Sequence, residues 1–334
     1  MNRVLPLAAL ALLAAFPASA QTLTPRRPVA TYSIVARDSV TGAMGVAVQS
    51  HWFSVGALVP FAESGVGAVA TQSFIDPRYG PLGLDLMRLG RTAPEALAAL
   101  VSTDDGRDVR QVGMVDAAGR AASHTGAKAI YAAGHHVGRG YATQANLMEK
   151  PTVADAMARA YEASTGDLAE RLLAALEAAE REGGDIRGKQ SAAIVVVRAT
   201  STGRPWLDRT FDLRVEDNPN PVAELRRLVT LQRAYLKLNE GDELVTAGKI
   251  DEAVAAYSEA MRIAPDAATN GEAPFWVGIT LASTGREADA LPYLRRAYAQ
   301  HRPWADLVGR LPAAGLLPAD DALVARLVAA MRAR

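Results

Sequence analysis

The stretch Thr31–Ser50, TYSIVARDSVTGAMGVAVQS, predicts how the first part of this chain folds. Apolar and β-branched residues fill both of its ends, and Asp38-Ser39 and Thr41-Gly42 supply turn residues between them. We therefore predict a hairpin of two β-strands that begins with a threonine. If the chain were trimmed to Thr31, this residue would carry both a hydroxyl nucleophile and a free α-amine, and that pair can form a complete hydrolytic centre.

The residues before Thr31 have the pattern of an export signal. Arg3 precedes an apolar run, Val4–Phe16, and Ala18-Ser19-Ala20 is an A-x-A cleavage signal. The run is shorter than the ~20 apolar residues that a transmembrane helix needs. We therefore predict a signal peptide over residues 1–20 and a leader or linker over residues 21–30. The mature protein is expected to be periplasmic or secreted, with no membrane span after signal removal.

Composition excludes several classes of function. The formal charge of the 334 residues is zero and no basic stripe is present, so nucleic-acid binding is not expected. The chain has no cysteine, which excludes disulfides, thiolate catalysis and cysteine metal sites. No metal or cofactor motif was found, and we expect neither a metal nor a cofactor.

Strand patterns and helix patterns alternate between residues 31 and 216. Ser191–Arg198 (SAAIVVVR) is so apolar that we predict a central strand with both faces buried. Other strands are predicted at 57–61, 65–71, 110–115, 120–124, 140–146 and 210–215, and helices at 81–89, 93–101, 153–163 and 168–182. This order predicts an α+β domain, in which antiparallel sheets are covered by pairs of helices.

After the DNPNP segment at 217–221 the pattern becomes helical, and an internal repeat is present. Gly241, Gly248, Ala253, Tyr257 and Ala260 are each followed 37 residues later by Gly278, Gly285, Ala290, Leu294 and Ala297. This period is close to the ~34 residues of a tetratricopeptide unit. We therefore predict an all-α, tetratricopeptide-like domain over residues 222–334, with the two glycines Gly241 and Gly278 at close helix crossings.

Several motifs of the first domain resemble those of a known family. TYSIVARD and GVAVQS are followed by GVGAVATQ, YGPLGLDLM, HTGAKA and GDIRGKQSAAIVVV. Together they resemble the domain of unknown function 1028 family, which is grouped with the N-terminal nucleophile (Ntn) hydrolases. The resemblance covers about residues 31–221. It implies a four-layer αββα sandwich, in agreement with the predicted order of elements, and a helical extension that is sometimes described as peptidoglycan-binding.

The resemblance also implies that Thr31 is the nucleophile, with its freed α-amine as the base. Two features differ from proteasome-like relatives. No lysine lies between Thr31 and Lys128, and Ala30 stands where a glycine usually precedes the nucleophile. Because residues 21–30 would remain after signal cleavage, a second cut would be needed to expose Thr31.

Other polar residues are candidates for the same site. Ser191 opens the predicted central strand and is a second candidate catalytic residue. Asp185 and Arg187 could hold a polar substrate group together with Gln190, or could brace the start of the strand. Further candidates for substrate binding stand at predicted strand ends: Ser50, His51, Thr71, Gln72, His124 and Asn146. Adjacent residues on a strand face opposite ways, which argues against a Ser50–His51 pair. His135 and His136 are predicted to be surface residues in a loop.

Two functions fit these patterns. The first is an exported Ntn-type hydrolase that acts on an amide or peptide bond of an unknown small-molecule or peptide substrate. The second is a non-catalytic binding protein with the same fold, whose helical domain engages a protein, peptide or peptidoglycan partner. A homo-oligomer is compatible with either function.

Overall fold

The computed structural model describes residues 31–333, and the predicted signal peptide and leader lie outside these residues. The hairpin predicted from the first stretch is present as β1 (Thr31–Arg37) and β2 (Met44–Ser50). Asp38 shapes its turn, because its Oδ1 accepts hydrogen bonds from Val40 N (3.0 Å) and Thr41 N (2.7 Å). Gly42 completes the turn with a φ of 74°, which glycine adopts without steric cost.

The hairpin forms the centre of a six-stranded sheet with the order β10-β9-β2-β1-β8-β7, and every pairing is antiparallel. The other strands of this sheet are β7 (Gly134–Gly138), β8 (Tyr141–Asn146), β9 (Ser191–Val197) and β10 (Arg209–Val215). Strand β9 is buried along its whole length and is flanked by β2 and β10. The prediction that His135 and His136 lie in a loop is wrong, since both residues belong to the edge strand β7.

A second antiparallel sheet has four strands in the order β3-β4-β5-β6. Its strands are β3 (Pro60–Glu63), β4 (Gly67–Ser73), β5 (Arg110–Asp116) and β6 (Ala121–Thr125). The first two strands begin two to three residues later than predicted. Valine, alanine and methionine side chains from both sheets form a common hydrophobic cluster, so the sheets are stacked face to face.

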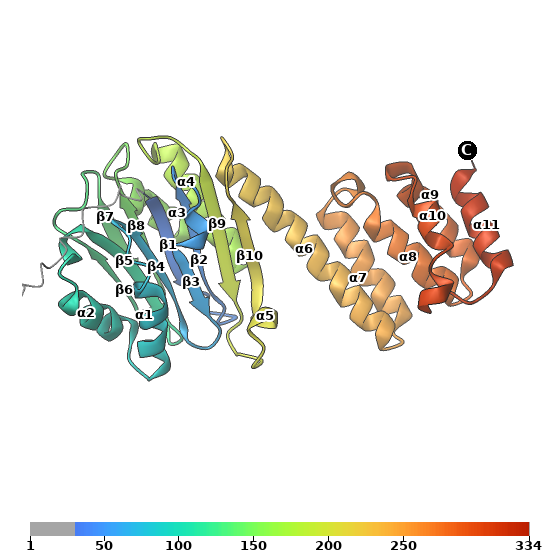
Figure 1. Ribbon diagram of the computed structural model, residues 1–334, viewed down its shortest axis with the longest axis horizontal. Coiled ribbons are helices and arrows are strands. Elements are labelled where there is room, and N and C mark those ends of the chain that lie inside the picture. The colour runs from blue at the N-terminus through green and yellow to red at the C-terminus, as the bar shows by residue number, and fades with distance from the viewer. Residues whose placement is uncertain (1–30, 334) are drawn as a thin grey trace, which may run out of the picture.

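Two pairs of helices cover the outer faces of the sheets (Figure 1). Helices α1 (Tyr79–Arg88) and α2 (Ala93–Thr103) share a core with the four-stranded sheet. Helices α3 (Val153–Ala163) and α4 (Leu168–Glu182) share one with the six-stranded sheet and have the predicted bounds. The Thr92 side chain begins α2 with a capping box, in which Glu95 N donates to Thr92 Oγ1. The predicted α+β class with antiparallel sheets is confirmed.

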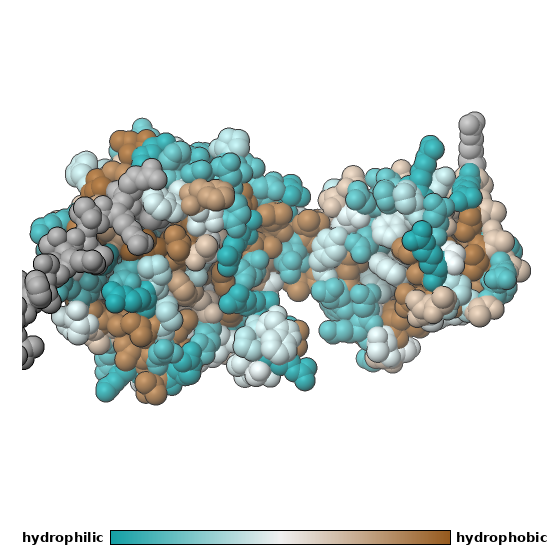
Figure 2. All heavy atoms as spheres, in the orientation of Figure 1, coloured by the Kyte–Doolittle hydropathy of each residue, from teal (hydrophilic) through white to brown (hydrophobic). Residues whose placement is uncertain are grey.

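The rest of the chain is helical and forms a second lobe (Figure 1). After the short α5 (Pro205–Asp208) and β10, the elements are α6 (Pro221–Thr246), α7 (Ile250–Ile263), α8 (Glu272–Ser283), α9 (Glu287–Gln300), α10 (Trp304–Val308) and α11 (Asp321–Arg332). Helix α6 joins the lobes. Val222, Leu225 and Val229 near its start are buried against the six-stranded sheet, whereas Ala234 and Leu238 belong to the core of the helical lobe. Figure 2 shows a narrow neck at this junction, where hydrophobic residues reach the surface.

The two repeated glycines lie at close contacts between antiparallel helices. A Cβ atom on Gly241 would be 2.2 Å from the Tyr257 ring, and one on Gly278 would be 2.6 Å from the Leu294 side chain. In both pairs the partner follows the glycine by sixteen residues, so the sequence repeat corresponds to a repeated helix contact. Within residues 31–333, no helix is both long and apolar enough to span a membrane.

Candidate functional site

A row of four polar residues crosses the inner face of the six-stranded sheet at one end. Thr31 on β1 is paired with Ser50 on β2 and with Asn146 on β8, and Ser50 is paired with Ser191 on β9. All four are fully buried. Because side chains alternate along a strand, these residues share the face that carries the valines of the core between the sheets. We call these four residues the polar row.

Two glutamines of the opposite sheet reach the polar row. Gln72 on β4 donates from Nε2 to the Thr31 carbonyl oxygen (3.1 Å), and Asn146 Nδ2 lies 3.4 Å from the same oxygen. Gln111 on β5 links the two amides, because its Oε1 accepts from Gln72 Nε2 (2.6 Å) and from Asn146 Nδ2 (2.9 Å). The backbone of Thr31 is therefore held by amide side chains from both sheets.

A second layer of polar side chains lies two residues further along the strands, at Ser33 on β1 and Gln144 on β8. Ser33 Oγ is 2.6 Å from Gln72 Oε1 and 2.9 Å from Gln144 Oε1. Gln144 fits between the sheets because Gly113 has no side chain, and a Cβ there would be only 2.1 Å from Gln144 Nε2. Burying a polar group without a partner is costly, and the hydrogen bonds within this cluster offset part of that cost.

The backbone is unusual immediately after two of these residues. Ser73 follows Gln72 with a φ of 68°, and Leu147 follows Asn146 with a φ of 57°. Non-glycine residues seldom adopt this left-handed region, and such residues are concentrated at functional sites. Strands β4 and β8 thus end beside the polar row with a residue in the left-handed conformation, which the surrounding structure must stabilise.

Ser191, the second predicted catalytic residue, lies two strands away from Thr31, which corresponds to about 9–10 Å across a sheet. Its hydroxyl donates to the Trp52 carbonyl oxygen (2.5 Å) and accepts a hydrogen bond from Val55 N (3.1 Å). Ser191 therefore fastens the turn that follows β2. No general base bonds to its hydroxyl in the contacts described for residues 31–333.

The predicted substrate-binding residues Asp185, Arg187 and Gln190 lie beside the polar row and brace neighbouring loops. Asp185 Oδ2 accepts from His51 N (3.0 Å) and from Arg187 Nη2 (2.8 Å), and the Asp185 side chain is fully buried. Gln190 Nε2 donates to Asp217 Oδ1 (3.2 Å). The Ser50 side chain is buried in the polar row, whereas His51, which follows the end of β2, is exposed.

Two other predicted site residues, Thr71 and His124, face away from the polar row. Thr71 is directly before Gln72 on β4 and its hydroxyl donates to the Asp76 carbonyl oxygen (3.1 Å) on the outer side of the sheet. His124 on β6 bonds through Nε2 to the Arg107 carbonyl oxygen (2.8 Å). Of the six residues predicted at strand ends, the structure brings Ser50, Gln72 and Asn146 together with Thr31.

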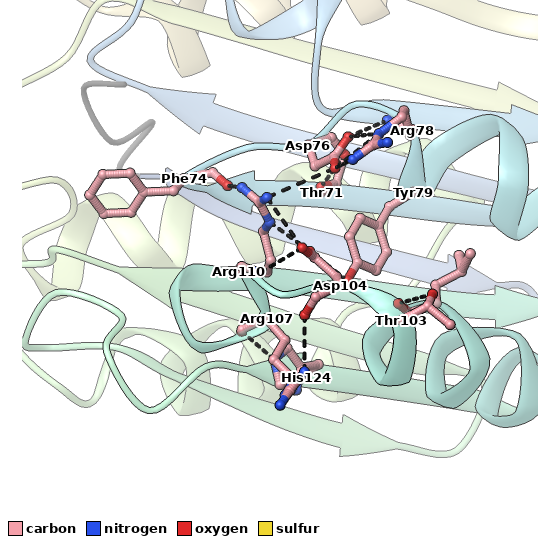
Figure 3. A network of polar contacts seen from close by, with 12 residues as sticks. Thr71, Phe74, Asp76, Arg78, Tyr79, Thr103, Asp104, Arg107, Arg110 and His124 are labelled. Atoms are coloured by element: carbon pink, nitrogen blue, oxygen red, sulfur yellow. Dashed lines mark hydrogen bonds and ion pairs between the residues drawn. The ribbon is translucent and has the colours of Figure 1, made fainter. Parts of the chain in front are cut away.

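Figure 3 shows a charged network around the loop that follows β4. Asp76 accepts hydrogen bonds from Arg78, which hold the pKa of Asp76 below its ordinary value. Burial raises the pKa of Asp104, but hydrogen bonds from Arg110 and from Gly106 N outweigh this effect and lower it. Tyr79 donates to Asp104 (3.0 Å), and its pKa is raised, mainly by burial. This network fixes the loop next to Ser73.

Sequence reasoning missed Ser33, Gln111 and the charged network. A usable signal was present for the first two. Ser33 stands two residues after Thr31 on the same strand face, and Gln111 is the second residue of a strand whose other inward positions are apolar or glycine.

The fold and the buried polar row define a mixed α+β protein with a candidate site between two antiparallel sheets. Residues 31–225 match a family of unknown function, DUF1028, and this chain belongs to that family. Among solved structures, the chain is similar to the crystal structure of protein SPO2555 from Silicibacter pomeroyi, which is assigned to the same family. The two are 32% identical with a TM-score of 0.54, over 60% of this chain and 84% of the other. No curated protein matches the chain.

Proposed function

We propose that this protein is an exported Ntn-type hydrolase that acts on an amide or peptide bond, with Thr31 as its nucleophile. The observation that carries the proposal is the position of Thr31. It is the first residue of an inner strand, between Ser50 and Asn146, and its carbonyl oxygen accepts hydrogen bonds from Gln72 and Asn146. The stacked sheets between helix pairs are the arrangement that the Ntn-hydrolase sandwich requires.

In the proposed reaction, the Thr31 hydroxyl oxygen attacks the carbonyl carbon of the substrate, and the freed α-amine takes the hydroxyl proton. The C–N bond of the substrate then breaks, and the proton passes to the leaving amine. An ester between Thr31 and the acyl group remains, and water hydrolyses it to regenerate the hydroxyl. With a residue still attached, the Thr31 nitrogen is an amide whose lone pair is delocalised, so it cannot act as this base.

The groups bonded to the Thr31 carbonyl are neutral amides rather than a lysine. We expect activity to rise with pH as the freed α-amine loses its proton, because only the uncharged amine can act as the base.

For the helical lobe we propose a tetratricopeptide-like array that engages a peptide or cell-wall partner. The repeated contacts of Gly241 with Tyr257 and of Gly278 with Leu294 support this assignment. The same array would serve the second function, in which the whole protein is a non-catalytic binding module.

The decisive test compares a form that begins at Thr31 with one that begins at Gln21, after intact-mass measurement has established where the exported protein starts. On a panel of amide and peptide substrates, the trimmed form should be the more active. Thr31→Ala should lower its activity by about 10³-fold or more, and Thr31→Ser should keep part of it. Thr143→Ala is a matched control, because Thr143 is an equally buried strand threonine that faces α3.

Equal turnover by the two forms, or an active Thr31→Ala variant, would place the nucleophile elsewhere. Loss of activity in Ser191→Ala with an active Thr31→Ala would identify Ser191. Complete inactivity of the trimmed form on the whole panel would favour the binding module.

A further inference from the structure

The orientation of the Gln111 side-chain amide is unambiguous, and it determines which groups donate and which accept in the hydrogen bonds around the polar row. Gln111 Nε2 lies 2.9 Å from the Ala145 carbonyl oxygen and 3.1 Å from that of Gly134. A carbonyl oxygen can only accept, so the nitrogen of the Gln111 amide must face these two groups. The Gln111 Oε1 atom then faces the polar row as an acceptor.

This acceptor determines how the next two amides are turned. Gln72 and Asn146 both approach Gln111 Oε1, so each must present its NH₂ group there. The Thr31 carbonyl oxygen requires the same orientation, because it also can only accept. The oxygen atoms of both amides consequently point away from Gln111. Gln72 Oε1 meets Ser33, and Asn146 Oδ1 is buried without a hydrogen-bond partner among the described residues.

The Ser33 hydroxyl determines the orientation of the Gln144 amide. A hydroxyl has one proton, and Ser33 Oγ must give it to Gln72 Oε1 at 2.6 Å. The Gln144 amide therefore presents its nitrogen to Ser33 and donates to Oγ. Its oxygen then takes the position beside Gly113 where the amide atom has no hydrogen-bond partner among the described residues.

From this chain of bonds we infer that Gln111 is a positioning residue for the site, and that it keeps Asn146 Oδ1 beside Thr31 as a hydrogen-bond acceptor. The inference rests on the proposed function, since an acceptor beside the nucleophile suits the N–H group of an amide substrate. Asn146 depends on Gln111 more than Gln72 does. Without Gln111, Asn146 Nδ2 keeps only the 3.4 Å contact to Thr31, whereas Gln72 Nε2 keeps one of 3.1 Å.

The test measures hydrogen exchange of side-chain NH₂ groups by NMR on the ¹⁵N-labelled full chain. In Gln111→Met, which has a similar shape but no hydrogen-bonding group, exchange at Asn146 should be faster by about tenfold or more, and exchange at Gln72 should rise less. Gln49→Met is the matched control. Gln49 is equally buried on β2, and neither of its amide atoms has a hydrogen-bond partner among the described residues.

Unchanged exchange at Asn146 in Gln111→Met, or an equal acceleration in Gln49→Met, would overturn the inference. Ser33→Ala tests the same chain of bonds if Gln111→Met does not fold. Exchange at the Gln144 NH₂ group should accelerate, and unchanged exchange there would show that Gln144 does not donate to Ser33. These readouts do not depend on turnover, so an inactive protein with the expected exchange pattern would contradict the proposed function alone.

Discussion

The space between the two sheets has two ends, which are built from the same strands and have opposite chemistry. At the apolar end, Val35, Val46 and Val195 pack with Ala68 and Val115 of the facing sheet. At the polar end, the polar row meets Gln72 and Gln111. Both ends are buried, but only the apolar end is stabilised by hydrophobic burial alone.

The difference shows what the polar end requires. Each amide buried there loses its hydrogen bonds to water and recovers only some of them, from neighbours in fixed directions. An apolar core tolerates exchanges between residues of similar volume, whereas the orientation of each amide in a buried network depends on the amides next to it. The amides at the polar end hold the backbone around Thr31 in a fixed geometry, but their burial stabilises the fold less than apolar burial does.

The largest expected effect comes from placing an amide at the apolar end. Val46→Asn replaces a fully buried valine by a side chain of similar size, among neighbours that offer no hydrogen bonds from their side chains. The loss of hydrophobic burial and the unpaired amide should together lower the free energy of unfolding by about 3–5 kcal/mol. Urea unfolding measures this. A loss below about 1 kcal/mol would mean that the two ends do not differ as described.

The next effect compares two buried glutamines. Gln111→Met removes a side chain that bonds to Gln72, Asn146 and two backbone carbonyl groups, and should lower the free energy of unfolding by about 2–3 kcal/mol. Gln49→Met removes an amide with no partner among the described residues, and should change stability by less than about 1 kcal/mol in either direction. Equal losses in urea unfolding would show that the network adds nothing beyond burial.

The sequence predicted the apolar end much better than the polar end, for a physical reason. Runs such as SAAIVVVR reveal buried strands directly, because hydrophobic burial depends on residue type and hardly on partner. The bounds of α3 and α4 were also predictable from helix formers and the Gly183-Gly184 stop. The edge strand β7 was missed, since its GHHVG sequence lacks that apolar signal.

The candidate site could be predicted only in part. Thr31, Gln72 and Asn146 were identified from their places at strand ends, but their contacts depend on the stacking of two sheets that are distant in sequence. Gln111 looked like an ordinary polar strand residue until β5 was placed opposite β8. Thr71 and Gln72 are both candidates from the sequence, although alternation along β4 sends them to opposite faces.

The smallest effect concerns charge, which distinguishes the network beyond β4 from the neutral amides Gln72, Gln111 and Asn146. The hydrogen bonds from Arg78 lower the pKa of Asp76 in the folded protein, below the value of about 3.9 that applies in the unfolded chain. This carboxylate therefore contributes stability that is fully present above about pH 4, and that contribution is lost as the pH falls through the lower, folded-state pKa.

Asp76→Asn should consequently be less stable than the parent near neutral pH, by about 1 kcal/mol, and the difference should shrink as the pH is lowered from 5 to about 2.5. Urea unfolding across that range measures it. Asp251→Asn is the control, because its carboxylate is 92% exposed and its ion pair lies on the surface, where such pairs contribute little. A difference for Asp76→Asn that stays constant with pH would attribute its effect to packing. The carboxylate would then contribute through shape rather than charge, and the contrast between this charged network and the neutral amides at the polar row would fail.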